Sequence, residues 1–405
     1  MINRDFYVNK LLLFNDSPGL IKAITGVRGS GKTTLLRLLK EQLLQQGVQE
    51  EDILSINLEE HAYHTINDPL ALHELVTSQL GSDPKQYIFL DEVHRVPSWE
   101  RAVNSLRLHD EYNLYITGSN ETLLDGPLAT ILAGRYVRIR LYPLAFQEFI
   151  SSQEATNRSE AFSHYLAHGG MPVINNLPET MHKEFLLSII DSIVRRDIYT
   201  RAQIRDEKVL SQIITFLGTN TGTLITTQSI ANYLTSIGTK TTSDTIGSYL
   251  TYLEEAYLFT KVHRFNIKGG YPMQTSNKYY ICDVGLQRAL IGSDSDYETL
   301  LQSVVFLELK RKHYTIYTGK INTLEVDFVV ESSTEKSRSY IQVASSCENH
   351  ETRERKLRPL KAIDDNFPKL ILTMDPISYT DSNGIQHRNI IDFLLQKEYI
   401  RFMSE

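Results

Sequence analysis

Near its amino end the sequence reads Gly26-Val27-Arg28-Gly29-Ser30-Gly31-Lys32-Thr33, between a short apolar run and a long amphipathic one. The spacing is that of the pattern G-x-x-x-x-G-K-[ST], whose glycines let successive backbone N–H groups face one phosphate. A helix that begins near Thr33 adds the positive end of its dipole. The sequence therefore predicts that this segment and Thr34 bind the phosphates of a nucleotide, which we expect to be ATP.

A second segment supplies acids that complement the first. The apolar run 87–90 ends in Asp91 and Glu92. We expect Lys32 to bridge the β and γ phosphates, and Thr33 and Asp91 to hold Mg2+. Glu92 is expected to orient or deprotonate the attacking water. A run that ends in two acids is common by itself, but its position downstream of a phosphate-binding segment favours this interpretation.

Short apolar runs alternate with longer amphipathic ones throughout residues 20–150. The expected strands are 20–25, 53–58, 87–90 and 114–117, and the expected first helix is 33–44. Gly47 follows that helix as a stop signal. This alternation is typical of an α/β fold with a parallel sheet and crossover helices.

Two further residues are candidates for catalysis. Asn120 follows the expected strand 114–117, at the sheet edge where ligands bind in open α/β folds, and it could sense the γ phosphate or the water. The alternative is that Gly118-Ser119-Asn120 only turns the chain. Arg135 could reach a nucleotide in its own or a neighbouring subunit, or it could be a surface residue.

Length and composition limit the remaining possibilities. A chain of 405 residues predicts two or three domains, and 41% hydrophobic with 22% charged residues is typical of globular proteins. The net charge of -7 argues against a surface coated in basic charge. The two cysteines form no CxxC pair and the histidines show no metal spacing. With no apolar stretch of membrane-spanning length, we expect a cytoplasmic protein without membrane contact.

Three domains and a connector are expected in the chain. Residues 1–150 form the nucleotide-binding domain and 151–206 a helical connector or lid. Residues 207–277 contain three helical stretches and a hairpin, the pattern of a winged helix-turn-helix. Residues 278–405 alternate helical and strand-like runs.

A series of short motifs extends along most of the chain. They are residues 27–34, 89–94, 117–120, 133–136, 142–149, 169–172, 196–198, 279–286, 325–328 and 340–343. In this order they resemble a large prokaryotic family of AAA-type ATPases with a C-terminal domain that looks like a degenerate nuclease. The resemblance implies an ATP-dependent core, a winged helix and a restriction-endonuclease-like terminal fold. His94 stands where that family often has Gln, and Leu301-Gln302 stands where a Glu-Asn pair is expected.

The terminal domain is expected to lack nuclease activity. Hydrolysis of this kind needs carboxylates on two strands and a lysine that positions water. Asp327 supplies one acid, and Glu308 is a second candidate, but the second motif reads Gln342-Val343-Ala344. The domain is then retained for binding or scaffolding. The alternative is that Lys310 or Lys320 replaces the missing lysine in space.

DNA, a protein and a second copy of the chain are all candidate partners. The expected recognition helix and its approach, 238–245, have many hydroxyls but a single cation, Lys240. Basic clusters at 310–312 and 353–361 could follow a phosphate backbone, or could be solvated helix faces.

These observations lead to one function and two alternatives. We expect a Mg2+-dependent ATPase whose cycle drives or switches the contacts that the other domains make with DNA or a protein. The alternatives are an ATP-coupled DNA nuclease and a switch that responds to nucleotide occupancy with negligible turnover.

Overall fold

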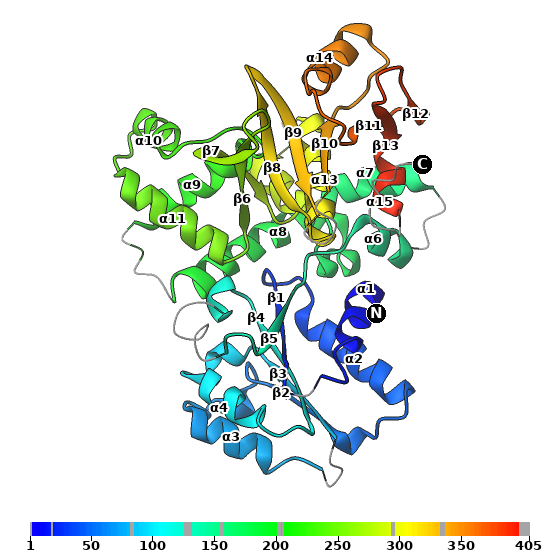
Figure 1. Ribbon diagram of the computed structural model, residues 1–405. Coiled ribbons are helices and arrows are strands. Elements are labelled where there is room, and N and C mark those ends of the chain that lie inside the picture. Colours follow the sequence, from blue (N-terminus) through cyan, green and yellow to red (C-terminus); the bar gives the residue numbers. More distant parts are fainter. Residues whose placement is uncertain are drawn as a thin grey trace. The chain divides into compact units, whose positions relative to one another are not determined.

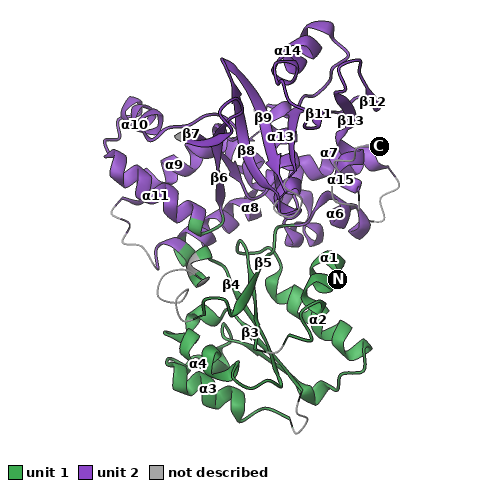
Figure 2. Ribbon diagram, in the orientation of Figure 1, with its two compact units in different colours: residues 1–143, 195–197, 255–257 green, residues 144–194, 198–254, 258–405 purple. Residues whose placement is uncertain are grey.

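The computed structural model describes residues 2–17, 19–81, 85–124, 132–153, 157–200, 204, 206–292, 296–332 and 337–396. The chain divides into two compact units, which Figure 2 colours separately. The first unit comprises residues 1–143, 195–197 and 255–257, and the second comprises 144–194, 198–254 and 258–405.

The first unit contains a five-stranded sheet with the strand order β2-β3-β4-β1-β5 (Figure 1). Its strands, all parallel, are β1 (Ile21–Thr25), β2 (Ile53–Asn57), β3 (Gln86–Asp91), β4 (Tyr112–Gly118) and β5 (Tyr136–Arg140). The α/β fold and the four predicted strands are confirmed. The edge strand β5 is additional, and its alternation of polar and apolar residues gave a weaker signal than the buried runs.

Helices cover both faces of this sheet. They are α1 (Asp5–Leu12), α2 (Lys32–Gln45), α3 (Pro69–Thr77) and α4 (Trp99–Leu106). Because neighbouring strand residues point to opposite faces, Ile88 packs with α3 and α4, while Phe89 packs with α1 and α2. Burial on both faces explains why the strands are continuous apolar runs. The predicted first helix is confirmed, and Gly47 follows its end with a φ of 93°.

The register aligns the carboxyl ends of three strands. Thr25 at the end of β1 pairs with Gly118 of β4, and Leu90 of β3 pairs with Ile116 of β4. The segments that follow β1, β3 and β4 therefore leave the sheet at one edge, where parallel α/β folds bind ligands.

The second unit contains an eight-stranded mixed sheet with the order β12-β13-β11-β10-β9-β8-β6-β7. Its strands are β6 (Phe259–Asn266), β7 (Tyr271–Ile281), β8 (Thr315–Ile321), β9 (Leu324–Glu331), β10 (Arg338–Val343), β11 (Lys369–Thr373), β12 (Tyr379–Thr380) and β13 (Gln386–Asn389).

The helices of this unit precede the sheet strands, lie between them or, in the case of α15, follow the last strand. They are α6 (Phe146–Ser152), α7 (Arg158–His168), α8 (Glu179–Ile193), α9 (Glu207–Thr219), α10 (Thr227–Ser236), α11 (Ser243–Glu255), α12 (Val284–Ile291), α13 (Tyr297–Arg311), α14 (His350–Lys361) and α15 (Ile390–Leu395). Among the described residues, no helix has both the length and the apolar character needed to cross a membrane.

The segment 207–277 contains the expected helices and hairpin, as α9, α10, α11 and the antiparallel pair β6–β7. The hairpin is part of a larger sheet, because β6 also pairs in parallel with β8. This pairing provides hydrogen-bond partners for the edge of β6, which an isolated hairpin would leave unpaired. The expected domain boundaries at residues 206 and 277 stay a prediction.

Two of the glycine-containing motifs meet inside the second unit. Asp283 caps the start of α12 by accepting hydrogen bonds from the backbone N–H groups of Gly285 and Leu286, and its second oxygen accepts one from Gly170. A Cβ on Gly285 would lie 2.0 Å from the carbonyl oxygen of His168 at the end of α7. The motifs at 169–172 and 279–286 therefore have a structural role, which is to bring α7 and α12 into close contact.

Candidate nucleotide-binding site

The phosphate loop, defined here as residues 26–33, joins β1 to α2. Gly26, Gly29 and Gly31 all have a positive φ, of 155°, 82° and 95°. A Cβ at position 26 would lie 2.2 Å from the carbonyl oxygen of Leu141. The first glycine is therefore required both by its backbone conformation and by the close approach of the chain after β5.

Lys32 lies at the start of α2 with its side chain across the loop. The residue is buried, and its Nζ donates a hydrogen bond of 3.1 Å to the carbonyl oxygen of Gly26. The same atom is 3.8 Å from Oε1 of Glu92. Burial lowers the pKa of Lys32, although Glu92, Asp197 and Asp91 favour the charged form. The ammonium thus lies among carboxylates at the edge where phosphates are expected.

Asp91 is held by hydroxyl groups from two other segments. Thr33 Oγ1 donates to Asp91 Oδ2 at 2.6 Å, and the hydroxyl of Thr117 on β4 donates to Oδ1. Burial raises the pKa of Asp91, and the two hydroxyl bonds oppose that rise. A hydroxyl and a carboxylate oxygen in contact are the hard oxygen ligands that Mg2+ prefers.

Glu92 follows Asp91 but leaves the strand. Its φ of 54° is in the left-handed region, and its backbone N–H donates to Thr117 Oγ1 at 2.8 Å. In a regular strand the side chains of Asp91 and Glu92 would point to opposite faces. The turn at Glu92 instead places its carboxylate near Lys32, with His94 Nδ1 3.4 Å from Oε2. Non-glycine residues in this conformation gather at functional sites.

A third acid, Asp197, also belongs to the site. It lies in the π-helical turn Val194–Ile198 that follows α8. Arg28 of the phosphate loop binds its carboxylate with two nitrogens, Nε at 3.1 Å and Nη2 at 3.0 Å. Sequence reasoning gave Asp197 no role, although the segment 196–198 is one of the motifs that carry the family resemblance.

The segment after β4 meets the same acid. Ser119 Oγ donates to Asp197 Oδ1 at 2.7 Å, and Asn120 Nδ2 lies 3.4 Å from the carbonyl oxygen of Asp197. Both residues are buried. Asn120 therefore lies at the expected edge of the sheet, beside Asp197, which also binds the phosphate loop through Arg28.

Arg135 is not brought to the phosphate loop. Its backbone carbonyl accepts from the N–H of Ile21, at the opposite end of β1, and its Nη1 donates to Asn104 of α4 at 3.1 Å. This position does not favour a contact with the nucleotide of its own chain. A contact with a neighbouring subunit stays a prediction.

The remaining loop residues fit a bound triphosphate with Mg2+. Ser30 Oγ is buried and, among the described residues, has no hydrogen-bond partner. The nitrogen of Lys32 donates to the carbonyl of Gly26, which a phosphate oxygen could replace as the acceptor. Val27 is buried within the loop, and Thr34 lies in the first turn of α2. Thr33 and Asp91 would hold the ion, and the loop N–H groups with Lys32 would hold the phosphates.

Comparison with known proteins agrees with this geometry. Residues 19–150 match the family model described as an AAA domain, and residues 159–297 match a domain of unknown function, DUF8612. The phosphate loop on a parallel sheet and the AAA match define the class: an AAA-type P-loop ATPase fold.

The chain also has relatives that extend over its whole length. An uncharacterized protein of Haemophilus influenzae is 38% identical over 404 residues, which cover 98% of this chain and 99% of that protein. The chain belongs to the same family as this protein. The uncharacterized protein MJ1544 of Methanocaldococcus jannaschii is 29% identical over 391 residues, which cover 90% of this chain and 82% of that protein. Among solved structures, the Walker-type ATPase of Pyrococcus abyssi is similar with a TM-score of 0.48 and 13% identity, covering 72% of this chain and 96% of that one.

Proposed function

We propose that the protein binds ATP with Mg2+ at the phosphate loop and hydrolyses its γ phosphate. The observation that carries this proposal is the arrangement around Thr117. Its hydroxyl bonds Asp91, which is in contact with Thr33, and also accepts from the backbone of Glu92. One residue of β4 thereby fixes the ion ligand and the water-activating acid together.

The chemistry follows from these positions. ATP supplies the phosphoanhydride bond that is cleaved. The loop N–H groups and Lys32 stabilise negative charge on the phosphate oxygens, which increases as the γ phosphoryl group leaves. Glu92 has the carboxylate that orients a water molecule and accepts its proton. Asn120 is a candidate for contact with the γ phosphate.

Asp197 is proposed as a positioning residue that responds to the nucleotide. Its carboxylate binds Arg28 in the phosphate loop and Ser119 after β4, so it connects two segments that contact phosphates in this proposal. A γ phosphate that attracts Arg28 would compete with this carboxylate. Occupancy of the loop would then alter the π-helical turn that contains Asp197.

The first experiment compares Glu92→Gln with Lys32→Ala in the full chain. We expect Glu92→Gln to bind ATP with unchanged affinity and to lose at least about a hundredfold in steady-state turnover, since only the proton acceptor is removed. Lys32→Ala is expected to lose nucleotide binding in an equilibrium titration. Glu41→Gln on the exposed face of α2 is the matched control and should behave as the wild type.

The outcomes separate hydrolysis from simple occupancy switching. Turnover that is equal in the wild type and Glu92→Gln contradicts the role of Glu92. Tight ATP binding without turnover in the wild type favours the nucleotide-occupancy switch. Unchanged affinity in Lys32→Ala contradicts the phosphate loop as the binding site.

A coupled DNA nuclease is the second candidate, and one observation favours it. A lysine does lie near Asp327: it is Lys356 of α14, with its Nζ 3.8 Å from Asp327 Oδ2. The roles considered for Lys310 and Lys320 stay predictions. The neighbouring groups argue against activity. Lys356 also binds Glu298 and the carbonyl of Val343, while the carboxylate of Asp327 accepts hydrogen bonds from the Val343 backbone and from Gln302.

We therefore expect no cutting when plasmid DNA is incubated with the full chain and Mg2+ or Mn2+. The comparison is between wild type and Asp327→Ala, with and without ATP. Cleavage that is present in the wild type and absent in Asp327→Ala would establish the nuclease. The same cleavage in both proteins indicates a contaminant.

The partner is proposed to be DNA or a protein, and the two basic clusters differ in what they offer. Arg311 in the cluster 310–312 is buried and paired with Glu308, so this cluster is not an exposed cationic surface. On α14, by contrast, Arg355, Arg358 and Lys361 line one groove together with Leu324 and Glu354. Three cations along a groove suit a phosphate backbone. A DNA titration at several salt concentrations tests this, and no association at low salt favours a protein partner.

A further inference from the structure

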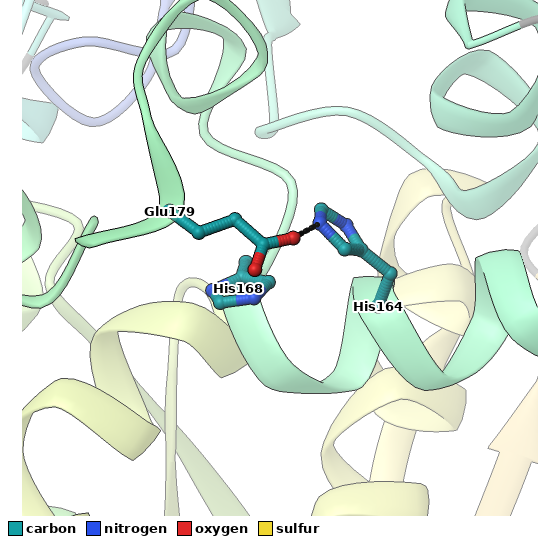
Figure 3. A group of neighbouring side chains, drawn as sticks. All are labelled: His164, His168 and Glu179. Carbon is teal, nitrogen blue, oxygen red and sulfur yellow. Dashed lines mark hydrogen bonds and ion pairs between the residues drawn. The ribbon is translucent and has the colours of Figure 1, made fainter. Parts of the chain in front are cut away.

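A group of histidines lies in the second unit, among residues to which the proposed ATPase gives no role. His164 and His168 are one turn apart on α7, and Glu179 is the first residue of α8 (Figure 3). The ring nitrogen Nε2 of His164 lies 3.0 Å from Oε1 of Glu179. One donor atom from each of the three residues lies within 4.8 Å of those of the other two.

This donor set has the composition of a transition-metal site. Two imidazoles and one carboxylate are ligands that Zn2+ accepts in tetrahedral sites, with water in the fourth position. Donor atoms around such an ion are separated by about 3.4 Å, given bonds of about 2.1 Å. This separation lies between the 3.0 Å from His164 to Glu179 and the 4.8 Å within which all three donor atoms lie. Small side-chain rotations therefore suffice to bind an ion.

A second observation is that hydrogen bonding within the group is incomplete. Nδ1 of His164 and Nδ1 of His182 are buried and have no hydrogen-bond partner in the described part of the chain. The ring of His182 is 4.5 Å from that of His168. Buried polar atoms without partners are costly, so the histidines are not explained as a satisfied polar network.

Access from the solvent also suits a metal. Glu179 is exposed, so an ion can enter from the solvent side.

We propose that His164, His168 and Glu179 bind a divalent transition-metal cation of the Zn2+ class, which ties the last turn of α7 to the first turn of α8. The chain between these turns contains the junction at Gly169 and Gly170, where Asp283 accepts from the backbone. The ion would thus brace the contact between α7 and α12. This site is independent of the phosphate loop.

The test uses the full-length protein without a histidine tag, stripped of metal and titrated with ZnCl2 by calorimetry. We expect one saturable site per chain, and visible absorption bands typical of tetrahedral coordination when Co2+ is used as the probe. Glu179→Gln and His168→Gln should each weaken Zn2+ binding by about tenfold or more. His64→Gln, from the exposed pair His61–His64 whose rings are 4.5 Å apart, is the matched control and should leave binding unchanged.

Two results would overturn the proposal. One is the absence of saturable binding to the wild type. The other is wild-type affinity in both Glu179→Gln and His168→Gln. Because Glu179 is exposed, its variant is expected to fold, and thermal unfolding without Zn2+ verifies this for each variant. ATP hydrolysis does not enter the measurement.

Discussion

At the scale of single residues, Thr117 shows how the site is assembled from strands that are not adjacent. β4 lies between β1, which carries the phosphate loop, and β3, which carries the acids. Thr117 on β4 donates to Asp91 and accepts from the backbone of Glu92. Through this one short side chain, the position of the central strand determines where both acids lie.

Asp91 provides the first residue-scale prediction. Its pKa in the folded protein is raised by burial, so its ionised form is less favourable in the folded than in the unfolded chain. The contribution to stability is therefore present below the unfolded pKa and is lost as the pH rises through the folded pKa. At pH 7, Asp91→Asn should raise the melting temperature of the nucleotide-free protein, on the order of 2 °C, and should abolish Mg2+-dependent hydrolysis.

The measurement is thermal unfolding at pH 7 without nucleotide. Asp68→Asn is the control, because Asp68 caps α3 at an exposed position where Asn caps equally well. A melting temperature that falls in Asp91→Asn but not in Asp68→Asn contradicts the expected cost of the buried carboxylate.

The sequence predicted the proximity of Lys32, Thr33, Asp91 and Glu92, because the carboxyl ends of parallel strands meet at one edge. Asp197 was missed because it lies far along the chain and no local pattern connects it to Arg28. The pair His164 and His168 was missed although its spacing of four residues on a helix was readable. Their third partner, Glu179, comes from another helix and becomes visible only in the fold.

At the scale of helices and strands, local patterns predicted elements better than their pairing. Apolar periodicity identified β1 to β4, α2 and the three helices from α9 to α11. The membership of β6 and β7 in the eight-stranded sheet depends on pairing with β8, more than forty residues away in sequence. Pairing over such distances leaves no local signal, so the sequence alone does not show that the hairpin belongs to a larger sheet.

The start of α12 gives an element-scale prediction. A methyl group on Gly285 would lie 2.0 Å from the backbone carbonyl oxygen of His168, and both residues belong to packed helices. Gly285→Ala should therefore destabilise the protein by about 1 to 3 kcal/mol. Chemical denaturation followed by circular dichroism measures this.

The control is a glycine in a helix with free space around it. Gly247 in α11 has no atom within 4 Å of an added Cβ. Gly247→Ala should therefore leave stability unchanged or raise it by about 0.4 to 1 kcal/mol. Equal effects of the two substitutions would show that the close approach at Gly285 has no energetic weight.

At the scale of the whole molecule, each unit contains buried hydrophobic clusters of its own. Two clusters surround the five-stranded sheet of the first unit, and another includes residues of β8, β10 and α14 in the second. The proposed nucleotide site lies in the first unit, and the proposed metal site in the second. Each ligand should therefore act on the stability of one unit.

Calorimetry tests this assignment. With a nonhydrolysable ATP analogue and Mg2+ at one hundred times the dissociation constant, we expect a stabilisation of about 2.7 kcal/mol in the transition that belongs to the first unit. Zn2+ should raise the other transition, and Lys32→Ala should remove only the effect of the analogue. A single transition that both ligands shift equally contradicts independent units.

The place of Asp197 in the chain has a practical consequence. Residues 195–197 belong to the first unit, although the chain on both sides of them belongs to the second. An excised piece ending at residue 150 would keep the whole phosphate loop and both acids, Asp91 at the end of β3 and Glu92 directly after it. It would also lose the carboxylate that holds Arg28. The compact unit that carries the complete candidate site is therefore not contiguous in sequence.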